Sequence, residues 1–155
     1  MTKILNSQEK KQIEKSLNEE FGIKQIPGML LSRGEERIFI FQGDLNEKQI
    51  EYLEKSVPVE RIGIYFARVI GKEVRLSIEG MHILKNQITK NIFDLNDSQV
   101  SSWLQGEDLQ IKIPFRGFLI MRYGEDFIGC GKASENKIGN FIPKSRRLKS
   151  KSIIK

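Results

Sequence analysis

The chain of 155 residues is poor in the side chains that most enzymes use for catalysis and metal binding: it contains one cysteine, Cys130, and one histidine, His82. A single cysteine excludes an internal disulfide and a multi-cysteine zinc site, and a single histidine removes most histidine-based metal and triad schemes. No apolar run reaches the roughly 18 residues that a membrane span needs, and the N-terminal residues lack the apolar segment of a secretory signal. We therefore expect a reduced, cytoplasmic protein without membrane association, metal or cofactor.

The positive charge is concentrated in the last third of the sequence. Residues 1–105 contain 15 Lys and Arg and 15 Asp and Glu, whereas residues 106–155 contain 11 basic and 5 acidic side chains. From Asn136 onward there are seven basic residues and no acidic one. Such a one-sided block is typical of a surface that binds a polyanion, usually nucleic acid. The alternative, a solvated and disordered basic tail, remains open for Lys149–Lys155.

The first half has the pattern of a mixed α/β unit. Asn6 and Glu9 form a capping-box pattern before an apolar stripe at Ile13, Leu17 and Phe21, which predicts a helix ended by Gly22. Strands are predicted over 29–32 and 37–42, followed by a helix capped by Asp44 and Glu47 that runs through about Lys55. A strand is predicted over 61–70, with Ile62, Ile64 and Phe66 on one face. A strand over 74–76 and a short helix after Ser77 complete the predicted elements of this half. The polar stretch 85–91 predicts a boundary between two halves.

The second half has one helix and several strands. Asn96 and Gln99 repeat the capping-box pattern, and Gly106 is placed to end the helix. Strands are predicted over 109–113, 117–123 and 127–131 and near 141–142, with a hairpin turn at 124–126. Several short strands after one helix indicate a small, partly closed β-barrel.

The segment Gly129-Cys130-Gly131-Lys132 resembles the end of a phosphate loop but fails its requirements. Position 126 is Asp where that motif needs Gly, and position 133 is Ala where it needs Ser or Thr. Two glycines in a strand instead indicate a bend or the close approach of another backbone. Cys130 is interpreted as a packed, inert thiol rather than a nucleophile, because the sequence places no base beside it.

The segment from Lys137 to Leu148 interleaves cations with apolar side chains, an amide and a proline. Solvated tails rarely carry that density of apolar residues, so we expect the segment to pack and its cations to be held in place. Cations placed in this way pair with phosphates, and Asn140 either contacts a base edge or holds the loop.

Residues 91–148 resemble the PUA domain appended to rRNA cytosine methyltransferases of the NOL/NOP/Sun/Fmu group. The resemblance rests on Asp94-Leu95-Asn96-Asp97, Arg116-Gly117-Phe118-Leu119-Ile120, Ile128-Gly129-Cys130-Gly131-Lys132, and Asn140-Phe141-Ile142-Pro143-Lys144 followed by Arg146-Arg147. The whole chain is also similar to small Nip-type ribosome-biogenesis proteins, in which an α+β pre-PUA unit precedes the PUA barrel, and stand-alone archaeal members of the group have about this length.

The resemblance implies an α+β fold with a pre-PUA-like domain at 1–86, a PUA-like RNA-binding domain at 87–149 and a basic tail at 150–155. It implies binding to structured rRNA or pre-ribosomal particles in ribosome biogenesis. The expected RNA contacts are Arg116, Arg122, Lys132, Lys137, Asn140, Lys144, Arg146 and Arg147, with Gly117, Gly129, Gly131 and Pro143 shaping the site.

The resemblance implies no catalysis, because those methyltransferases need an S-adenosylmethionine domain and a Pro-Cys dipeptide, whereas Cys130 follows Gly129. Two alternatives stay open. The first half could dock a separate rRNA methyltransferase or biogenesis factor while the second half delivers RNA, or the chain could be an enzyme with an unrecognised site.

Overall fold

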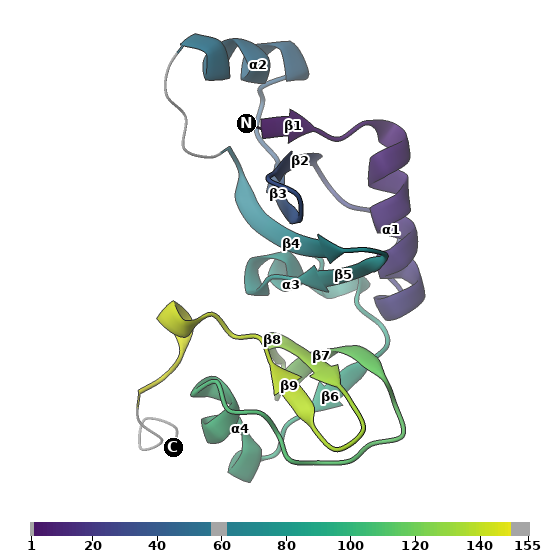
Figure 1. Cartoon of the computed structure of the whole chain (residues 1–155), viewed down its shortest axis with the longest axis vertical. Helices are drawn as coiled ribbons and strands as arrows, with labels where there is room; N and C mark the ends of the chain where they lie inside the picture. The colour runs from purple at the N-terminus through teal and green to yellow at the C-terminus, as the bar shows by residue number, and fades with distance from the viewer. Residues whose placement is uncertain (1, 57–61, 150–155) are drawn as a thin grey trace.

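The computed structural model describes residues 2–56 and 62–149, and these form two units stacked along the long axis of the molecule (Figure 1). The first unit is a five-stranded sheet with helices, and the second is a four-stranded sheet with one α-helix in its described residues. The predicted α+β class, with a mixed α/β unit followed by a β-rich unit, is confirmed. Residues 57–61, where the predicted strand 61–70 begins, and the predicted tail 150–155 lie outside the described residues.

The first sheet is an antiparallel meander in which each strand pairs with the next along the chain. Its strands are β1 (Thr2–Ile4), β2 (Met29–Arg33), β3 (Arg37–Phe41), β4 (Ile64–Ile70) and β5 (Glu73–Leu76). Strand β1 was not predicted, because three residues are too short to show an alternating pattern. It pairs with β2 in the register Lys3 to Ser32.

Helix α1 (Ser7–Phe21) covers one face of this sheet and forms as predicted (Figure 1). The Asn6 side chain accepts a hydrogen bond from the Glu9 backbone N–H at 2.9 Å, and the Glu9 carboxylate accepts one from the Asn6 backbone N–H at 3.1 Å. The predicted apolar stripe is buried. Gly22 ends the helix with a φ of +79°, a conformation that favours glycine.

Helix α2 (Glu47–Ser56) begins later than predicted. The capping pair is Asn46 and Gln49, whose side chains each accept the other residue's backbone N–H at 2.9 Å, so the predicted pair Asp44 and Glu47 was wrong. Helix α3 (Ile78–Ile83) begins after Ser77 as predicted, with the Ser77 hydroxyl accepting the Gly80 N–H at 2.9 Å.

Ile64 does not share a buried face with Ile62 and Phe66, contrary to the predicted alternation. Ile64 is 48% exposed, whereas Ile62 and Phe66 are buried. Two features explain this. Gly63 has a φ of +85° between Ile62 and the strand, and Phe66 is an extra residue in the β3–β4 pairing, where Phe39 opposes Tyr65 and Ile38 opposes Ala67. Such a bulge moves the side chains on either side of it to opposite faces.

The second sheet has the order β6 (Ile92–Asp94), β7 (Gly117–Tyr123), β8 (Asp126–Ala133) and β9 (Ile138–Asn140). Strand β6 runs parallel to β7, and the other pairs are antiparallel. Helix α4 (Asp97–Leu104) has the predicted capping box. The β7–β8 hairpin closes at the predicted turn, and Gly106 has a φ of +91° just beyond α4.

Two predicted strands of the second half were misplaced. Leu109 makes a single bridge to Ile138, and the residues after it form no strand. Antiparallel pairing from that bridge would run into the turn between β8 and β9, so residues 110–113 have no partner strand. The last strand ends at Asn140 rather than lying at 141–142, and Pro143 beyond it lacks an N–H for a ladder. Two short 3-10 helices complete the fold, η1 (Lys85–Gln87) and η2 (Lys144–Arg146).

Strand β7 is buried on both faces and joins the two units. Phe118 and Ile120 pack into the core formed by α1 and the first sheet. Leu119 and Met121 point to the opposite face, into a second core with Trp103 of α4. Helix α3 packs against both β4 and β8 between the two sheets. The two halves therefore share a continuous hydrophobic core.

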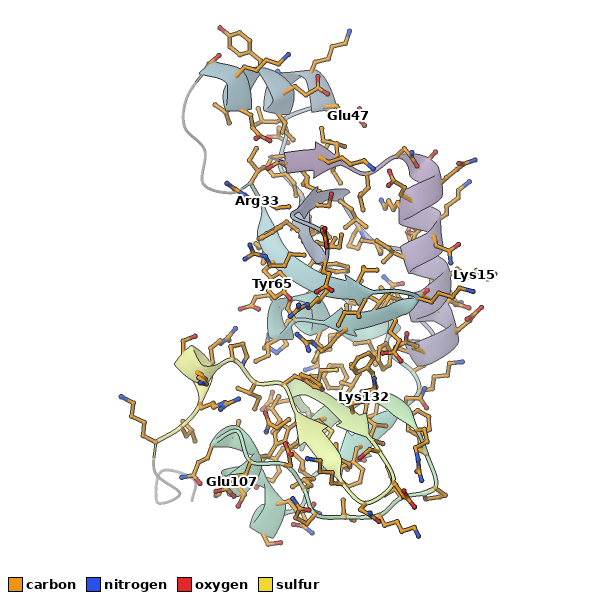
Figure 2. All side chains as sticks on the ribbon, in the orientation of Figure 1. Lys15, Arg33, Glu47, Tyr65, Glu107 and Lys132 are labelled. Atoms are coloured by element: carbon orange, nitrogen blue, oxygen red, sulfur yellow. The ribbon has the colours of Figure 1, made fainter. Side chains whose placement is uncertain are left out.

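Polar contacts reinforce this junction. The Lys132 ammonium on β8 pairs with Glu73 on β5 at 3.0 Å, and Figure 2 shows Lys132 between the two units. Arg146 pairs with Glu79 of α3, and the His82 Nε2 atom lies 3.1 Å from the Phe127 carbonyl oxygen. The Thr89 N–H donates to the Phe21 carbonyl at 2.9 Å, which fixes the connecting segment on the end of α1.

The shared core predicts that the two units unfold together. Phe66 is fully buried in the first unit, so Phe66→Ala is expected to destabilise the protein by roughly 3 to 5 kcal/mol. Trp103 is the only tryptophan in the chain and lies in the second unit. We expect its fluorescence transition to shift downward by on the order of 10 °C, because each kcal/mol lowers the melting temperature by roughly 2 to 4 °C in a chain of this size.

Tyr52→Ala is the control for aromatic truncation, because Tyr52 is 73% exposed. This variant should leave the transition within the scatter expected of surface substitutions. A Trp103 transition that stays at the wild-type temperature in Phe66→Ala would show that the units unfold independently.

Candidate RNA-binding surface

The predicted glycines of β8 make room for Trp103. A Cβ atom on Gly131 would lie 2.6 Å from an Ile138 methyl carbon and 3.2 Å from the Trp103 ring, and Gly129 has a φ of +128° close to Ile142 and the indole nitrogen. The Trp103 Nε1–H donates to the Ile128 carbonyl at 3.1 Å. The two glycines thus leave space for the Trp103 side chain, whereas the sequence predicted a bend in the strand or the close approach of another backbone. Their packing against Trp103 sets the position of β8, which precedes the basic segment Lys137–Leu148.

Asn140 braces the turn after β9. Its Nδ2 group donates to the Trp103 carbonyl at 2.7 Å and to the Glu107 carbonyl at 3.1 Å. Its Oδ1 atom accepts the Ile142 N–H at 2.8 Å. Of the two roles that the sequence left open, this geometry favours holding the loop, since both Nδ2 hydrogens are engaged within the fold. A base contact by Asn140 stays a prediction.

Lys137 and Arg147 flank one carboxylate. The Lys137 ammonium lies 2.8 Å from Asp108, whose other oxygen accepts the Asn140 backbone N–H at 2.8 Å. These hydrogen bonds, that of Lys137 foremost, and the nearby Arg147 charge lower the pKa of Asp108. Arg147 Nε donates to the Ile142 carbonyl at 2.9 Å. Both cations are therefore held beside the braced turn.

Arg122 and Arg116 lie on and before β7. The Arg122 guanidinium makes a bidentate pair with Asp94 of β6 at 2.6 and 3.0 Å, and this hydrogen bonding lowers the pKa of the carboxyl. Arg116 is exposed and donates to the Ile113 and Phe115 carbonyls at 3.3 and 2.9 Å. Arg122 is thus partly neutralised within the fold, whereas Arg116 keeps its charge available at the surface.

Lys132 and Arg146 face the first unit. Lys132 pairs with Glu73 and lies near Glu20, a partly buried carboxyl whose pKa burial raises to about 7. Arg146 pairs with Glu79. The cations are therefore divided into two groups, one at the junction and one around Asp108. Lys144 is exposed at the start of η2, and no carboxylate of the described residues lies within 4.0 Å of its ammonium.

Sequence reasoning missed Arg75 of β5. This guanidinium lies 4.3 Å from the centre of the Phe141 ring and lines the same cleft as Arg146. Its position depends on how the two units pack, and the local pattern Glu73-Val74-Arg75-Leu76 indicates only an alternating strand. No sequence signal connects this residue to the basic segment some 65 positions later.

Cys130 is buried in the core that the two units share. Desolvation raises the pKa of its thiol to about 12, which keeps it protonated at neutral pH. Within residues 2–56 and 62–149, no group of three or more His, Cys, Asp or Glu side chains is arranged to hold a metal ion. No helix in the described part of the chain is long and apolar enough to cross a membrane.

Comparison with known proteins supports the resemblance seen in the second unit. Residues 90–148 match the family described as the Methyltransferase RsmF PUA domain. The Ribosomal RNA small subunit methyltransferase F of Psychromonas ingrahamii is 27% identical over 131 residues, which cover 81% of this chain and 26% of that protein. The matched share exceeds residues 90–148, so the similarity extends into the first unit. The chain spans about a quarter of the length of this curated relative.

The contacts of Asn140 predict a structural effect of its removal. Asn140→Ala leaves two carbonyls and one N–H without their partner, and we expect a loss of about 1 to 3 kcal/mol in unfolding free energy. Urea unfolding followed by Trp103 fluorescence measures this loss, with Lys144→Ala as the exposed control. An unchanged stability together with altered RNA preference would instead assign Asn140 to base reading.

Proposed function

We propose that this chain is an RNA-binding protein whose second unit holds structured ribosomal RNA during rRNA processing or ribosome assembly. The observation that carries the proposal is the match of residues 90–148 to the PUA domain of an rRNA methyltransferase. The basic segment Lys137–Leu148 supports it, because Asp108 and Asn140 hold its start on that unit and the Leu148 N–H donates to the Leu104 carbonyl at its end.

Binding by such a surface depends on exchange of ion pairs. Lys137 and Arg146 are paired with carboxylates in the free protein, so a phosphate replaces a carboxylate as their partner. Exposed pairs of this kind contribute little to stability, with a median of about 0 to 1 kcal/mol. Replacing the carboxylate by a phosphate therefore costs little free energy. The guanidinium of Arg146 can form bidentate hydrogen bonds to a phosphate. A-form RNA presents its phosphates and 2′-hydroxyls to such a surface.

We propose further that the chain is not itself catalytic. The sequence has no Pro-Cys dipeptide, and the thiol of its single cysteine is buried and protonated.

A second candidate function is that of an adaptor for a separate rRNA-modifying enzyme or biogenesis factor. Its supporting observation is the outer surface of α2, where Leu45, Tyr52 and Leu53 are exposed and line a shallow depression. Figure 1 shows α2 at the end of the first unit that lies away from the second unit. A partner bound there would leave the basic segment accessible to RNA.

The RNA-binding proposal predicts the salt dependence of affinity. Each phosphate contact lowers log K by about 0.7 to 0.9 per unit of log salt. The triple variant Lys144→Ala, Arg146→Ala, Arg147→Ala should therefore flatten the slope by roughly 2 to 3. Fluorescence anisotropy with labelled rRNA fragments at several salt concentrations measures the slope.

The matched control removes three exposed lysines of the first unit, Lys11, Lys15 and Lys24. It changes the net charge by the same amount, so a comparable flattening in the control would show that affinity follows total charge. A wild-type slope in the basic-segment variant would exclude these three cations as the RNA contacts.

The adaptor proposal predicts a separable defect. Tyr52→Ala combined with Leu53→Ala should weaken binding to an rRNA methyltransferase of the same organism by at least tenfold, as measured by calorimetry, and leave RNA affinity unchanged. Tyrosine is enriched among the few interface residues whose truncation costs about 2 kcal/mol or more. Absence of a complex with the wild-type protein would refute the methyltransferase as the adaptor's partner.

A further inference from the structure

A cleft of about 360 Å³ opens at the junction of the two units. Its walls come from β4, β5 and the start of α3 in the first unit, and from β8 and the segment around η2 in the second (Figure 1). We call it the junction cleft and define it by its lining residues: Ile64, Tyr65, Arg75, Leu76, Ser77, Ile78, Glu79, Cys130, Phe141, Pro143, Ser145 and Arg146. Tyr65, labelled in Figure 2, marks its first-unit side.

An aromatic ring is presented to this cleft. Phe141 follows the braced Asn140 and keeps 38% of its surface exposed. The Arg75 guanidinium lies 4.3 Å from the ring centre, and Phe118 meets the ring edge-on at 6.1 Å between centroids. Ile64, 48% exposed, lines the same cleft. Two large apolar side chains are therefore left open to solvent at one concave place.

The cleft also contains polar and charged groups. Arg75 and Arg146 contribute two cations and Glu79 one carboxylate, and Tyr65 and Ser145 contribute hydroxyl-bearing side chains. Arg146 belongs to the acid-free basic segment and pairs with Glu79 in the free protein. The cleft is thus continuous with the phosphate-binding surface proposed for the second unit.

This combination fits one chemical class of ligand. A nucleobase is flat, offers a π-face for stacking on an aromatic ring or a guanidinium plane, and carries donors and acceptors on its edge. Its attached phosphate requires a cation nearby. The volume lies at the small end of ligand sites, roughly 300 to 1,000 Å³, which suits one nucleotide and excludes a duplex.

We propose that the junction cleft binds one unpaired nucleobase, stacked on Phe141 and Arg75, with the adjacent phosphate on Arg146. The proposal rests on the RNA-binding function proposed above and adds to it a reason for discriminating among RNAs, namely recognition of an unstacked nucleotide. A free mononucleotide presents the same chemistry, and the experiment separates the two sources.

The test compares two RNA hairpins, one perfectly paired and one with a single bulged adenosine, by fluorescence anisotropy. Wild-type protein should prefer the bulged hairpin. Phe141→Ala should weaken binding to the bulged hairpin by about 5- to 150-fold, since stacking contributes about 1 to 3 kcal/mol per base and about 1.4 kcal/mol equals a factor of ten. Binding to the paired hairpin should stay unchanged, and Phe141→Tyr should retain the preference.

An abasic nucleotide at the bulge tests the same contact from the RNA side. It should weaken wild-type binding as much as Phe141→Ala does, and the two changes together should have no larger effect than either alone, because they remove one interaction. Additive effects, or equal weakening for both hairpins, would overturn the assignment. Trp103 fluorescence and thermal unfolding confirm that Phe141→Ala remains folded.

Titration with adenosine 5′-monophosphate by calorimetry completes the test. Wild-type protein that binds RNA with the expected salt slope, but shows neither a bulge preference nor mononucleotide binding, refutes the cleft and leaves the RNA-binding function standing. Protein that binds no RNA refutes that function. If the protein binds no RNA but binds the mononucleotide, and Phe141→Ala abolishes that binding, the cleft remains supported with a free nucleotide as its ligand. If the protein binds neither RNA nor the mononucleotide, the cleft proposal is refuted as well.

Discussion

Strand β7 is buried on both faces, and this burial holds the two units together. Phe118 and Ile120 are part of the core of the first unit, while Leu119 and Met121 complete the core around Trp103. A strand covered on both sides must be apolar at consecutive positions, and this run is. Because the strand cannot leave one core without also disturbing the other, the units keep a fixed relation, and the junction cleft between them has a fixed shape.

Local signals in the sequence predicted local structure well. The Asn6–Glu9 and Asn96–Gln99 boxes, the Gly22 stop and the β7–β8 turn depend on neighbours within a few residues, and each lies where the pattern places it. Two errors were local, the α2 cap two residues too early and the short strand β1. The others arose where distant pairing decides the outcome: the bulge at Phe66 and the missing partner for 110–113 depend on other strands. The continuous apolar run of β7 indicates burial on both faces, and the polar stretch 85–91 carries no information on this shared core.

The candidate RNA-binding surface could be predicted as a segment but not as a geometry. The acid-free run after Asn136 is a property of composition, whereas the carboxylates that pair with its cations come from α3 and the loop after α4, and that of β5 pairs with Lys132 before the run. Net charge counted along the chain therefore overstates the free positive charge at Lys132, Lys137 and Arg146. Arg75 shows the opposite error, since a cation in an electrically neutral half becomes part of the basic region only through folding.

The parallel pairing of β6 with β7 bears on the order in which the chain folds. In the first sheet, β2–β3 and β4–β5 are tight hairpins, whereas α1 separates β1 from β2 and α2 separates β3 from β4; β6 and β7 are likewise separated by α4 and the irregular segment after it. Contacts between residues that are far apart in sequence require a larger loss of chain entropy, and this loss occurs before the contacts contribute stabilising energy. Because domains generally fold from the N-terminus during synthesis, we infer that the first sheet forms first and then offers its apolar surface to Phe118 and Ile120, so that β7 packs on an existing template. During synthesis from the N-terminus, the template emerges from the ribosome before the strand that needs it.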